Sequence, residues 1–445
     1  MTDTIAAVAT PAGRGGVGII RVSGPKAGEI AAAVCGRCPP PRQAVRASFR
    51  DRQGEVIDDG LALFFAAPAS FTGEDVLELQ GHGSPQALAL LLQCVLRLGA
   101  RLAEPGEFTR RAFLNEKLDL AQAEAVADLI DAATASAARA AARSLSGEFS
   151  RRIGELRDAL VRLRMFVEAT LDFPEEDIEF IEQARARDQL TTVEQALIRV
   201  LAAARHGQRL HDGARIVLAG APNVGKSSLL NALAGEELAI VTPIAGTTRD
   251  TVSARLDLEG LPVEVIDTAG LRATADPVES IGIQRARAAI AEADLAILLV
   301  EATCADPERF WDALAEELPR GQPRLRLLTK IDLAPEAVTA AAATAALAIS
   351  ARTGQGIDVL RRELAARLGH DPREEGAFIA RARHVHAIER AQTHLTAARA
   401  ELHAGALELF AEALRLAHDA LGEITGEFTA DDLLGEIFSR FCIGK

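Results

Sequence analysis

The stretch GAPNVGKS, residues 220–227, constrains the fold more than any other part of the chain. It follows the apolar, strand-like residues 214–219 and precedes the helical pattern of residues 228–234. Glycines in the pattern G-x-x-x-x-G-K-S let backbone N–H groups close around phosphate, and the helix N-terminus adds its dipole. Lys226 would supply a cation to the β- and γ-phosphates, and Ser227 a hydroxyl to Mg²⁺. The stretch therefore predicts a nucleotide-binding loop after a strand.

Four short motifs follow the loop, and each suits one part of a magnesium–nucleotide complex. AGTTRD contains Thr248, whose hydroxyl suits Mg²⁺. DTAG contains Asp267 for the Mg²⁺ shell and Gly270, whose amide can meet the γ-phosphate. In TKID, Asp332 can accept the two donors of guanine, which selects GTP over ATP. SAR (residues 350–352) would contact the base through a main-chain amide. Together, the motifs resemble the motif set of translation-factor-related GTPases.

The predicted GTP site comprises the loop, the segments around AGTTRD and DTAG, and the two base-binding motifs. Its residues are Asn223, Val224, Gly225, Lys226, Ser227, Ser228, Thr242, Pro243, Ile244, Ala245, Gly246, Thr247, Thr248, Asp267, Thr268, Ala269, Gly270, Thr329, Lys330, Asp332, Ser350, Ala351 and Arg352. Among them we expect Lys226 and Thr248 to take part in catalysis, since both would touch the phosphates or their metal ion.

Three positions depart from common GTPase patterns. Thr329 replaces the asparagine of N-K-x-D, and Arg352 replaces the lysine of S-A-K, so we expect GTP to be bound with weakened affinity. Leu271 stands where Ras-like proteins have a water-positioning glutamine, so the enzyme is either a poor hydrolase or uses another group. The amide of Asn223 could help to ligate a monovalent cation beside the phosphates; a plain turn residue is the alternative.

Sequence patterns divide the chain into four segments. Residues 1–117 have the pattern of an α+β domain, and residues 118–212 are helical and rich in alanine. Residues 213–370 alternate strands with helices, which is typical of a doubly wound sheet, and residues 371–445 are helical again. The sequence thus predicts a multidomain protein, part α/β and part all-α. Its P-loop G domain is inserted into one discontinuous helical domain.

Composition limits the classes of partner and compartment. The net charge of −14 argues against a general polyanion binder, so any nucleic acid would have to meet a local basic patch. The chain shows neither an apolar run as long as a membrane span nor a signal peptide, and its odd cysteine count indicates reduced thiols in the cytoplasm. Lysine is rare, and Lys117, Lys226, Lys330 and Lys445 are therefore candidate functional residues.

Three stretches outside the G domain carry a more specific signal. They are DTIAAVATPAGRGGVGIIRVSGP (residues 3–25), SFTGEDVLELQGHGSP (residues 70–85) and EPGEFTRRAFLNEKLDLAQAEAVADLIDA (residues 104–132). Together with the G motifs, VESIGIQRA and the final FCIGK, they make the chain resemble the MnmE (TrmE) family of tRNA modification GTPases over essentially its whole length.

The resemblance implies a function and a set of partners. Residues 1–117 would bind tetrahydrofolate and form a homodimer, and the protein would work with the FAD-dependent MnmG (GidA) in a heterotetramer or larger complex. Together they would add a carboxymethylaminomethyl or aminomethyl group to C5 of the wobble uridine of certain tRNAs. The carbon would come from 5,10-methylenetetrahydrofolate, for which 5-formyltetrahydrofolate is an analogue, while FAD and NADH would act through the partner.

The resemblance also assigns individual residues. It places K⁺ at Asn223, Thr242, Ile244 and Thr247. This ion would activate GTP hydrolysis when the G domains of two protomers meet. It places Mg²⁺ at Ser227 and Thr248, and it assigns to Glu279 the role of orienting the water for hydrolysis. It places folate at Arg21, Glu78, Lys117 and Lys445.

The chemistry of the folate residues agrees with this assignment. Arg21 and Lys117 suit the carboxylates of a folate, and Glu78 suits pterin donors. A simple cross-strand ion pair between Arg21 and Glu78 is the alternative. In the tail, Cys442 is either a nucleophile or a small buried packing residue.

Other functions share part of this pattern. A ribosome-assembly GTPase of the Era/Der kind has the same G motifs, but it predicts a KH-type G-x-x-G that we do not find convincingly. A folate enzyme of the aminomethyltransferase type with a regulatory G domain is a further alternative. For tRNA, the basic helical faces within residues 151–164 and 381–394 are candidate surfaces, although solvated faces are the simpler interpretation. Cys35 and Cys38 form a lone C-x-x-C, which falls short of a four-ligand zinc site.

Overall fold

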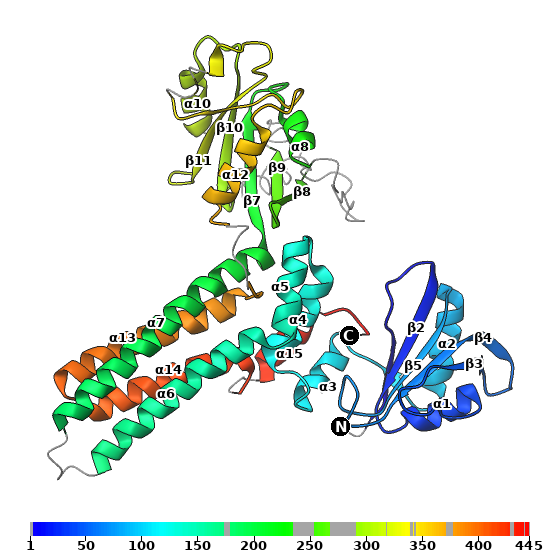
Figure 1. The fold of residues 1–445 in the computed structure, drawn as a ribbon. Coiled ribbons are helices and arrows are strands. Elements are labelled where there is room, and N and C mark those ends of the chain that lie inside the picture. Colours follow the sequence, from blue (N-terminus) through cyan, green and yellow to red (C-terminus); the bar gives the residue numbers. More distant parts are fainter. Residues whose placement is uncertain are drawn as a thin grey trace, which may run out of the picture. The chain divides into compact units, whose positions relative to one another are not determined.

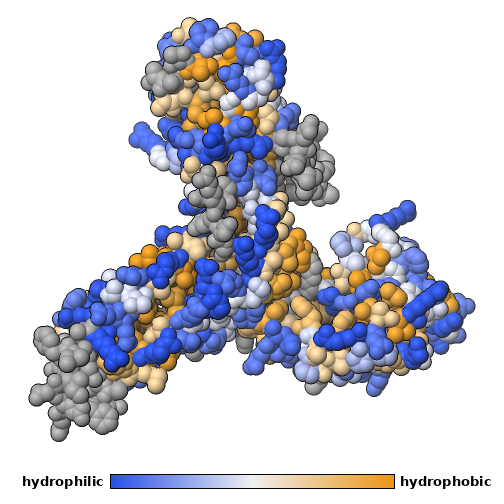
Figure 2. All heavy atoms as spheres, viewed as in Figure 1, coloured by the Kyte–Doolittle hydropathy of each residue, from blue (hydrophilic) through white to orange (hydrophobic). Residues whose placement is uncertain are grey.

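Figure 1 shows the fold of the protein in a computed structural model, and Figure 2 shows the hydropathy of the residues on one face of it. It describes residues 3–172, 179–234, 253–267, 291–316, 318–338, 341, 344–370, 377–427, 431–439 and 441–444. The chain divides into two compact units, each made of separate stretches of sequence. The first contains residues 1–127, 145–193 and 390–445, and the second contains residues 128–144 and 194–389.

A six-stranded mixed sheet forms the N-terminal part of the first unit. Its strands are β1 (Ile5–Val8), β2 (Gly15–Ser23), β3 (Val45–Arg50), β4 (Val56–Phe65), β5 (Val76–Gly83) and β6 (Arg101–Leu102), in the order β3-β4-β5-β2-β1-β6. All neighbouring strands are antiparallel except β1 and β6. Helices α1 (Ala27–Cys35) and α2 (Pro85–Arg97) cover one face and share a core with Ile20, Leu77 and Leu79. This confirms the predicted α+β domain.

Helices from two separate parts of the sequence form most of the rest of the first unit. They are α3 (Glu107–Leu114), α4 (Leu120–Asp131), α6 (Glu148–Asp172), α14 (Leu407–Thr425) and α15 (Asp431–Ser439). Helix α14 packs along α6, and Leu120 and Ala123 of α4 share a core with Leu434 and Phe438 of α15 (Figure 1). The helical domain is therefore discontinuous in sequence, as predicted.

Three more helices lie wholly or partly in the second unit. They are α5 (Ala135–Leu145), α7 (Glu179–Asp212) and α13 (Ala382–Ala404). Helices α7 and α13 cross the division between the units, and polar contacts join them in both: Arg399 to Thr191 in the first, and Arg205 to Glu389 in the second. The G domain begins directly after α7, so its first strand continues from a long helix.

The second unit contains a six-stranded sheet in the order β12-β11-β10-β7-β9-β8. Its strands are β7 (Ala214–Gly220), β8 (Ser253–Leu258), β9 (Leu261–Asp267), β10 (Leu295–Glu301), β11 (Arg324–Thr329) and β12 (Leu347–Ala348). The strands are parallel apart from the β8–β9 hairpin. Helices α8 (Lys226–Ala234) and α12 (Ile357–Arg367) pack on one face and α10 (Pro307–Glu316) on the other, which confirms the doubly wound fold.

One detail of this sheet differs from the sequence pattern. Residues 256–270 read as one strand-like run, but the chain turns at Glu259 and Gly260, whose φ angles are +55° and +97°. A positive φ favours glycine because it lacks a Cβ. The run therefore forms the antiparallel pair β8–β9 rather than a single strand.

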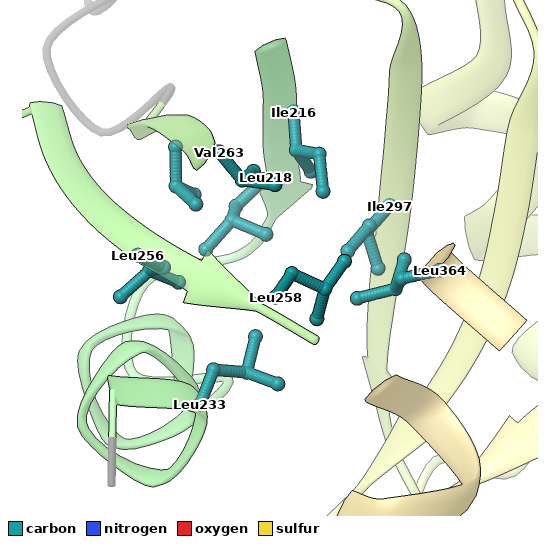
Figure 3. Close-up of a pocket in the computed structure, with 9 residues that line it drawn as sticks. Ile216, Leu218, Leu233, Leu256, Leu258, Val263, Ile297 and Leu364 are labelled. Carbon is teal, nitrogen blue, oxygen red and sulfur yellow. The ribbon is translucent and has the colours of Figure 1, made fainter. Parts of the chain in front are cut away.

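A small hollow lies inside the core of the G domain (Figure 3). Aliphatic side chains from the sheet, α8 and α12 line it, among them Ile216, Leu258 and Leu364. All nine lining side chains are apolar, so the space has nothing with which to bind a phosphate or a base. The hollow is a packing gap, and a nucleotide binds in this kind of fold at the carboxyl ends of the parallel strands.

Candidate nucleotide and folate sites

The phosphate-binding loop lies between β7 and α8. Strand β7 ends at Gly220 and α8 begins at Lys226, so five residues make the turn. Asn223 and Gly225 have φ angles of +62° and +106°, which the tight turn requires. A Cβ on Gly220 would lie 2.8 Å from the carbonyl oxygen of Leu299 on β10. Glycine at this position therefore lets the loop sit close against the neighbouring strand.

The side chain of Lys226 folds back over the loop. Its Nζ donates to the carbonyl oxygens of Gly220 (2.9 Å) and Ala221 (3.3 Å), and the residue is only 8% exposed. A positive charge is thus held where the sequence predicts the β- and γ-phosphates. Ser227 and Ser228 are exposed in the first turn of α8, where a hydroxyl can meet a metal ion or a phosphate.

The two predicted base-binding motifs meet at Asp332. Its Oδ1 accepts a hydrogen bond from Ser350 Oγ at 2.7 Å, and Arg352 Nη2 lies 2.7 Å from its Oδ2. The hydrogen bond from Ser350 and the charge of Arg352 hold the pKa of the Asp332 carboxyl below its usual value. Asp332 is therefore ionised at neutral pH, as an acceptor for two guanine donors must be.

Thr329 and Lys330 connect this base region to neighbouring strands. Thr329 Oγ1 donates to the carbonyl oxygen of Val224 in the phosphate-binding loop at 2.7 Å. Lys330 Nζ pairs with the carboxylate of Glu301 at the end of β10. The structure thus brings the phosphate-binding loop, TKID and SAR together at one edge of the sheet.

Part of the predicted site lies outside the described residues. This part comprises Thr242, Pro243, Ile244, Ala245, Gly246, Thr247, Thr248, Thr268, Ala269, Gly270, Leu271 and Glu279. The backbone of Asp267 ends β9, where it pairs in register with Leu218 of β7. The roles given to these residues, including water orientation and most of the K⁺ site, remain predictions.

Arg21 and Glu78 form the cross-strand pair that the sequence left as an alternative. They oppose each other in the β2–β5 register, and Arg21 Nε donates to Glu78 Oε1 at 3.0 Å. The Arg21 guanidinium also lies 5.9 Å from the centre of the Phe71 ring and 5.8 Å from that of Phe108. The pair does not exclude a ligand, because both side chains keep some exposure.

The segment before β5 links Arg21 to Lys117. Phe71 lies beside Arg21, and the aliphatic part of Lys117 packs near Gly73. Asn115 Nδ2 donates to the carbonyl oxygen of Thr72 at 2.6 Å, which fixes the segment to the residues just before Lys117. Lys117 itself is exposed. Arg21 and Lys117, two residues predicted to bind folate, therefore both lie beside the segment before β5, and both carry a positive charge.

Arg111 supports this region, although the sequence analysis did not single it out. It is fully buried and contacts the carboxylates of Asp3, Glu74 and Glu107. Glu74 belongs to the segment beside Arg21 and also accepts a hydrogen bond from Ser23 Oγ at 2.7 Å. The only sequence signal was the four-residue spacing of Glu107 and Arg111, which is typical of a helical ion pair.

The C-terminal tail reaches the same region. Ile443 pairs with Pro105, and Arg21 Nη1 donates to the carbonyl oxygen of Gly444 at 3.4 Å. Lys445 is outside the described residues, but its neighbour lies at Arg21. Cys442 is exposed, so the expectation of a buried packing residue is wrong. Its backbone carbonyl accepts a weak hydrogen bond from Gly106 N at 3.4 Å.

Carboxylates accompany the arginines of the two basic faces. In the first, Arg151 and Arg152 pair with Glu148, while Arg157 pairs with Glu427. In the second, Arg381 pairs with Asp128 and Arg390 with Glu423. These contacts favour the solvated interpretation over a tRNA surface.

The cysteine pair shows no sign of a metal or redox site. In the described parts of the chain, no three His, Cys, Asp or Glu side chains are grouped as a metal ion would need. Burial raises the pKa of the Cys35 thiol to about 11, so it stays protonated at neutral pH. Cys38 is exposed, and its pKa is raised as well.

Two family models match the chain in adjacent stretches. The model described as "GTP-binding protein TrmE N-terminus" matches residues 4–117, and that of the "MnmE helical domain" matches residues 120–442. No described helix combines the length and the apolar character needed to cross a membrane.

Curated relatives resemble the chain along its whole length. It is 58% identical over 444 residues to the tRNA modification GTPase MnmE of Neisseria meningitidis serogroup A, with 99% of each chain covered. It is 56% identical over 468 residues to the protein of the same name from Cupriavidus necator, covering 99% of this chain and 98% of the relative. Among solved structures, the G-domain of FeoB from Methanococcus jannaschii is 27% identical, with a TM-score of 0.27. It covers 35% of this chain and 98% of its own.

Proposed function

The chain belongs to the MnmE family of tRNA modification GTPases, and from this premise we propose that it modifies the wobble uridine of certain tRNAs at C5. The added group is carboxymethylaminomethyl or aminomethyl, and the reaction needs the FAD-dependent partner MnmG with its NADH. The observation that carries the proposal is identity over the whole chain, including the N-terminal domain and the tail, and not over the G domain alone.

GTP hydrolysis is the activity of the G domain in this proposal. Lys226 neutralises the β- and γ-phosphates, Asp332 selects guanine, and Ser227 with Thr248 holds Mg²⁺. The exposed hydroxyl of Ser227 at the start of α8 fits a metal ligand. Asn223, Thr242, Ile244 and Thr247 would hold K⁺, which would supply the charge stabilisation that an arginine finger gives elsewhere. Glu279 takes the place of the missing glutamine in orienting water.

A reduced folate binds in the N-terminal domain and supplies the one-carbon unit. Arg21, Glu78, Lys117 and Lys445 hold it, and three observations support this: the Arg21–Glu78 pair, the exposed Lys117, and the tail that reaches Arg21. A folate ends in carboxylates, which suit the positive charges of Arg21 and Lys117. Its pterin ring presents hydrogen-bond donors, which suit the carboxylate of Glu78. The protein acts in the cytoplasm as a homodimer bound to MnmG.

Analysis of tRNA nucleosides tests the proposed reaction. Bulk tRNA from cells that lack the gene is digested and examined by mass spectrometry, and the gene is then restored. We expect the C5-substituted wobble uridines to disappear on deletion and to return with the wild-type gene, but not with Lys226→Ala. If these nucleosides stay at wild-type levels after deletion, the proposal is wrong. A ribosome-assembly defect with normal tRNA would favour the Era/Der alternative.

The cation role makes a separate prediction. GTP turnover should rise strongly when K⁺ replaces Na⁺. The proposed site, built from one amide and several carbonyl oxygens, suits K⁺, the larger of the two ions, and the bound charge would stabilise the transition state. Asn223→Ala should remove the difference while Mg²⁺-dependent GTP binding persists. The rates are measured as phosphate release at equal ionic strength. Equal turnover of the wild-type protein in the two salts would rule out the cation role.

A further inference from the structure

Thr329 occupies the junction between the phosphate-binding loop and the base-binding motifs. It is the last residue of β11 and is 3% exposed. Its hydroxyl lies 2.7 Å from the carbonyl oxygen of Val224 and 3.3 Å from that of Val300. Val224 belongs to the loop that encloses the phosphates, and Asp332 follows three residues after Thr329. The hydroxyl thus ties the two halves of the nucleotide site together.

The number of protons on the side chain limits what Thr329 can do. A threonine hydroxyl has one donor proton, whereas an asparagine amide has two. Both neighbours of Thr329 Oγ1 are carbonyl oxygens, which only accept, so its single proton is used within the protein. The asparagine of N-K-x-D could make the same bond to the loop and still donate once more. Threonine cannot donate to a ligand without breaking its bond to Val224.

One acceptor atom of guanine, N7, has no partner in the proposed site. Guanine presents donors to a carboxylate on one edge and the acceptors O6 and N7 on the other. Asp332 takes the donors and a main-chain amide of SAR takes O6, which leaves N7 for position 329. We propose that Thr329 is a positioning residue that holds the phosphate-binding loop in place and makes no hydrogen bond to guanine N7. This chain therefore selects guanine without a contact to N7. The inference rests on the proposed guanine site at Asp332.

Binding of GDP and 7-deaza-GDP, which lacks the N7 acceptor, tests the inference by titration calorimetry on the full chain. We expect the wild-type protein to bind the two nucleotides with dissociation constants within about twofold of each other. Thr329→Asn should bind GDP about three- to tenfold more tightly than the wild-type protein, since one hydrogen bond is gained. Its affinity for 7-deaza-GDP should stay unchanged. A wild-type protein that binds 7-deaza-GDP fivefold or more weakly than GDP would overturn the inference.

Two more variants separate loop positioning from base recognition. Thr329→Val keeps the shape of the side chain but loses the hydroxyl, so it should weaken GDP and 7-deaza-GDP by the same factor. Thr329→Ser keeps the hydroxyl and should retain the wild-type pattern. Thr329→Val with wild-type affinity for both nucleotides would reject the positioning role. These comparisons hold even where Thr329→Asn fails to fold.

A variant of Asp332 tests the guanine site itself. Xanthine has a carbonyl where guanine has its 2-amino group, so an amide suits it better than a carboxylate does. Asp332→Asn should therefore shift the preference from GDP to xanthosine diphosphate. Absence of this shift would remove the guanine site on which the inference rests. A shift combined with N7 discrimination by the wild-type protein would instead refute the role of Thr329 alone.

Discussion

At the scale of single residues, Arg111 is the buried charge that holds together the segments around Arg21, where we propose that folate binds. Its guanidinium is fully buried and donates to Asp3 O at 2.9 Å, Glu74 Oε2 at 3.0 Å and Glu107 Oε1 at 2.9 Å. Burial tends to raise the pKa of Glu107, but hydrogen bonds from Arg101 and Arg111 bring it below the usual value. Removing Arg111 would take from Glu74 the guanidinium that pairs with it, whereas Asp3 and Glu107 would keep only Arg101.

We therefore expect Arg111→Met to destabilise the N-terminal domain by about 3–5 kcal/mol, as breaking a buried ion pair generally does. Hydrogen exchange of peptides from β2 and β5 measures the change locally. Arg110→Met is the matched control, because Arg110 is exposed on the same helix and should alter stability by less than about 0.5 kcal/mol. Equal exchange rates in the two variants would contradict the role given to Arg111.

The sequence predicted individual site residues where a motif has fixed spacing. Lys226 and Asp332 belong to such motifs, and the structure places them at one edge of the sheet. Arg111 could not be found in this way. Its partners Asp3 and Glu74 lie 108 and 37 residues away, and no short pattern reports a contact that depends on tertiary packing. The register that opposes Arg21 to Glu78 was predicted only as an alternative, because strand pairing depends on the turns between strands.

At the scale of elements, two helical glycines have opposite surroundings. A Cβ on Gly207 of α7 would overlap the carbonyl oxygen of Phe378 and approach Ala380 N to 3.0 Å. The segment around Phe378 cannot move away freely, because Ser144 Oγ donates to the carbonyl oxygen of Ile379 at 3.0 Å. Gly154 of α6 has open space at the same position, with nothing within 4 Å.

Alanine substitution should accordingly have opposite effects at the two sites. Gly207→Ala should destabilise the second unit by about 1–3 kcal/mol, the usual result of overpacking against backbone atoms. Gly154→Ala should stabilise α6 by about 0.5–1 kcal/mol, because alanine is the better helix former. Thermal unfolding of the full chain, together with hydrogen exchange of α6 and α7 peptides, measures both effects. A stabilised Gly207→Ala protein would show that α7 does not pack against residues 378–380.

Elements with a strong apolar period were predicted more readily than edge elements. Strand β3 has no clear strand pattern in the sequence, since it lies at the edge of its sheet and carries Arg46 and Arg50 among its apolar residues. The short strand β6 has only two residues and pairs in parallel with β1, so it too has no local pattern that predicts it. Both elements are specified by pairing with a neighbour, which a local pattern does not contain.

At the scale of the whole chain, the proposed folate site brings together residues from opposite ends of the sequence. Arg21 and Gly444 are 423 residues apart, yet the Arg21 guanidinium donates to the Gly444 carbonyl oxygen. Hydropathy alone predicts a helical segment at the C-terminus and says nothing of where its last residues return. The rarity of lysine and the resemblance to a family directed attention to the tail, and its contacts with Pro105 and Arg21 are what the structure adds.

Gly444 offers a way to move the tail without replacing any of the side chains proposed to bind folate. Its φ is +100°, and a Cβ would overlap the carbonyl oxygen of Val8 on β1. Gly444→Ala should therefore displace the last residues and with them Lys445, the proposed folate ligand. Gly435→Ala is the matched control, because Gly435 is an exposed helical residue near the same end with nothing within 4 Å of its added Cβ.

We expect Gly444→Ala to weaken binding of 5-formyltetrahydrofolate by about tenfold or more, as the loss of a charge-assisted hydrogen bond generally does. Its affinity for GDP should not change, because every described residue of the proposed nucleotide site belongs to the second unit. Titration calorimetry with each ligand measures the two affinities on the same protein. If Gly444→Ala and Gly435→Ala bind the folate equally well, the tail is not part of the folate site. If Gly444→Ala weakens both ligands, the variant has disturbed the whole fold, and displacement of the tail does not explain the loss.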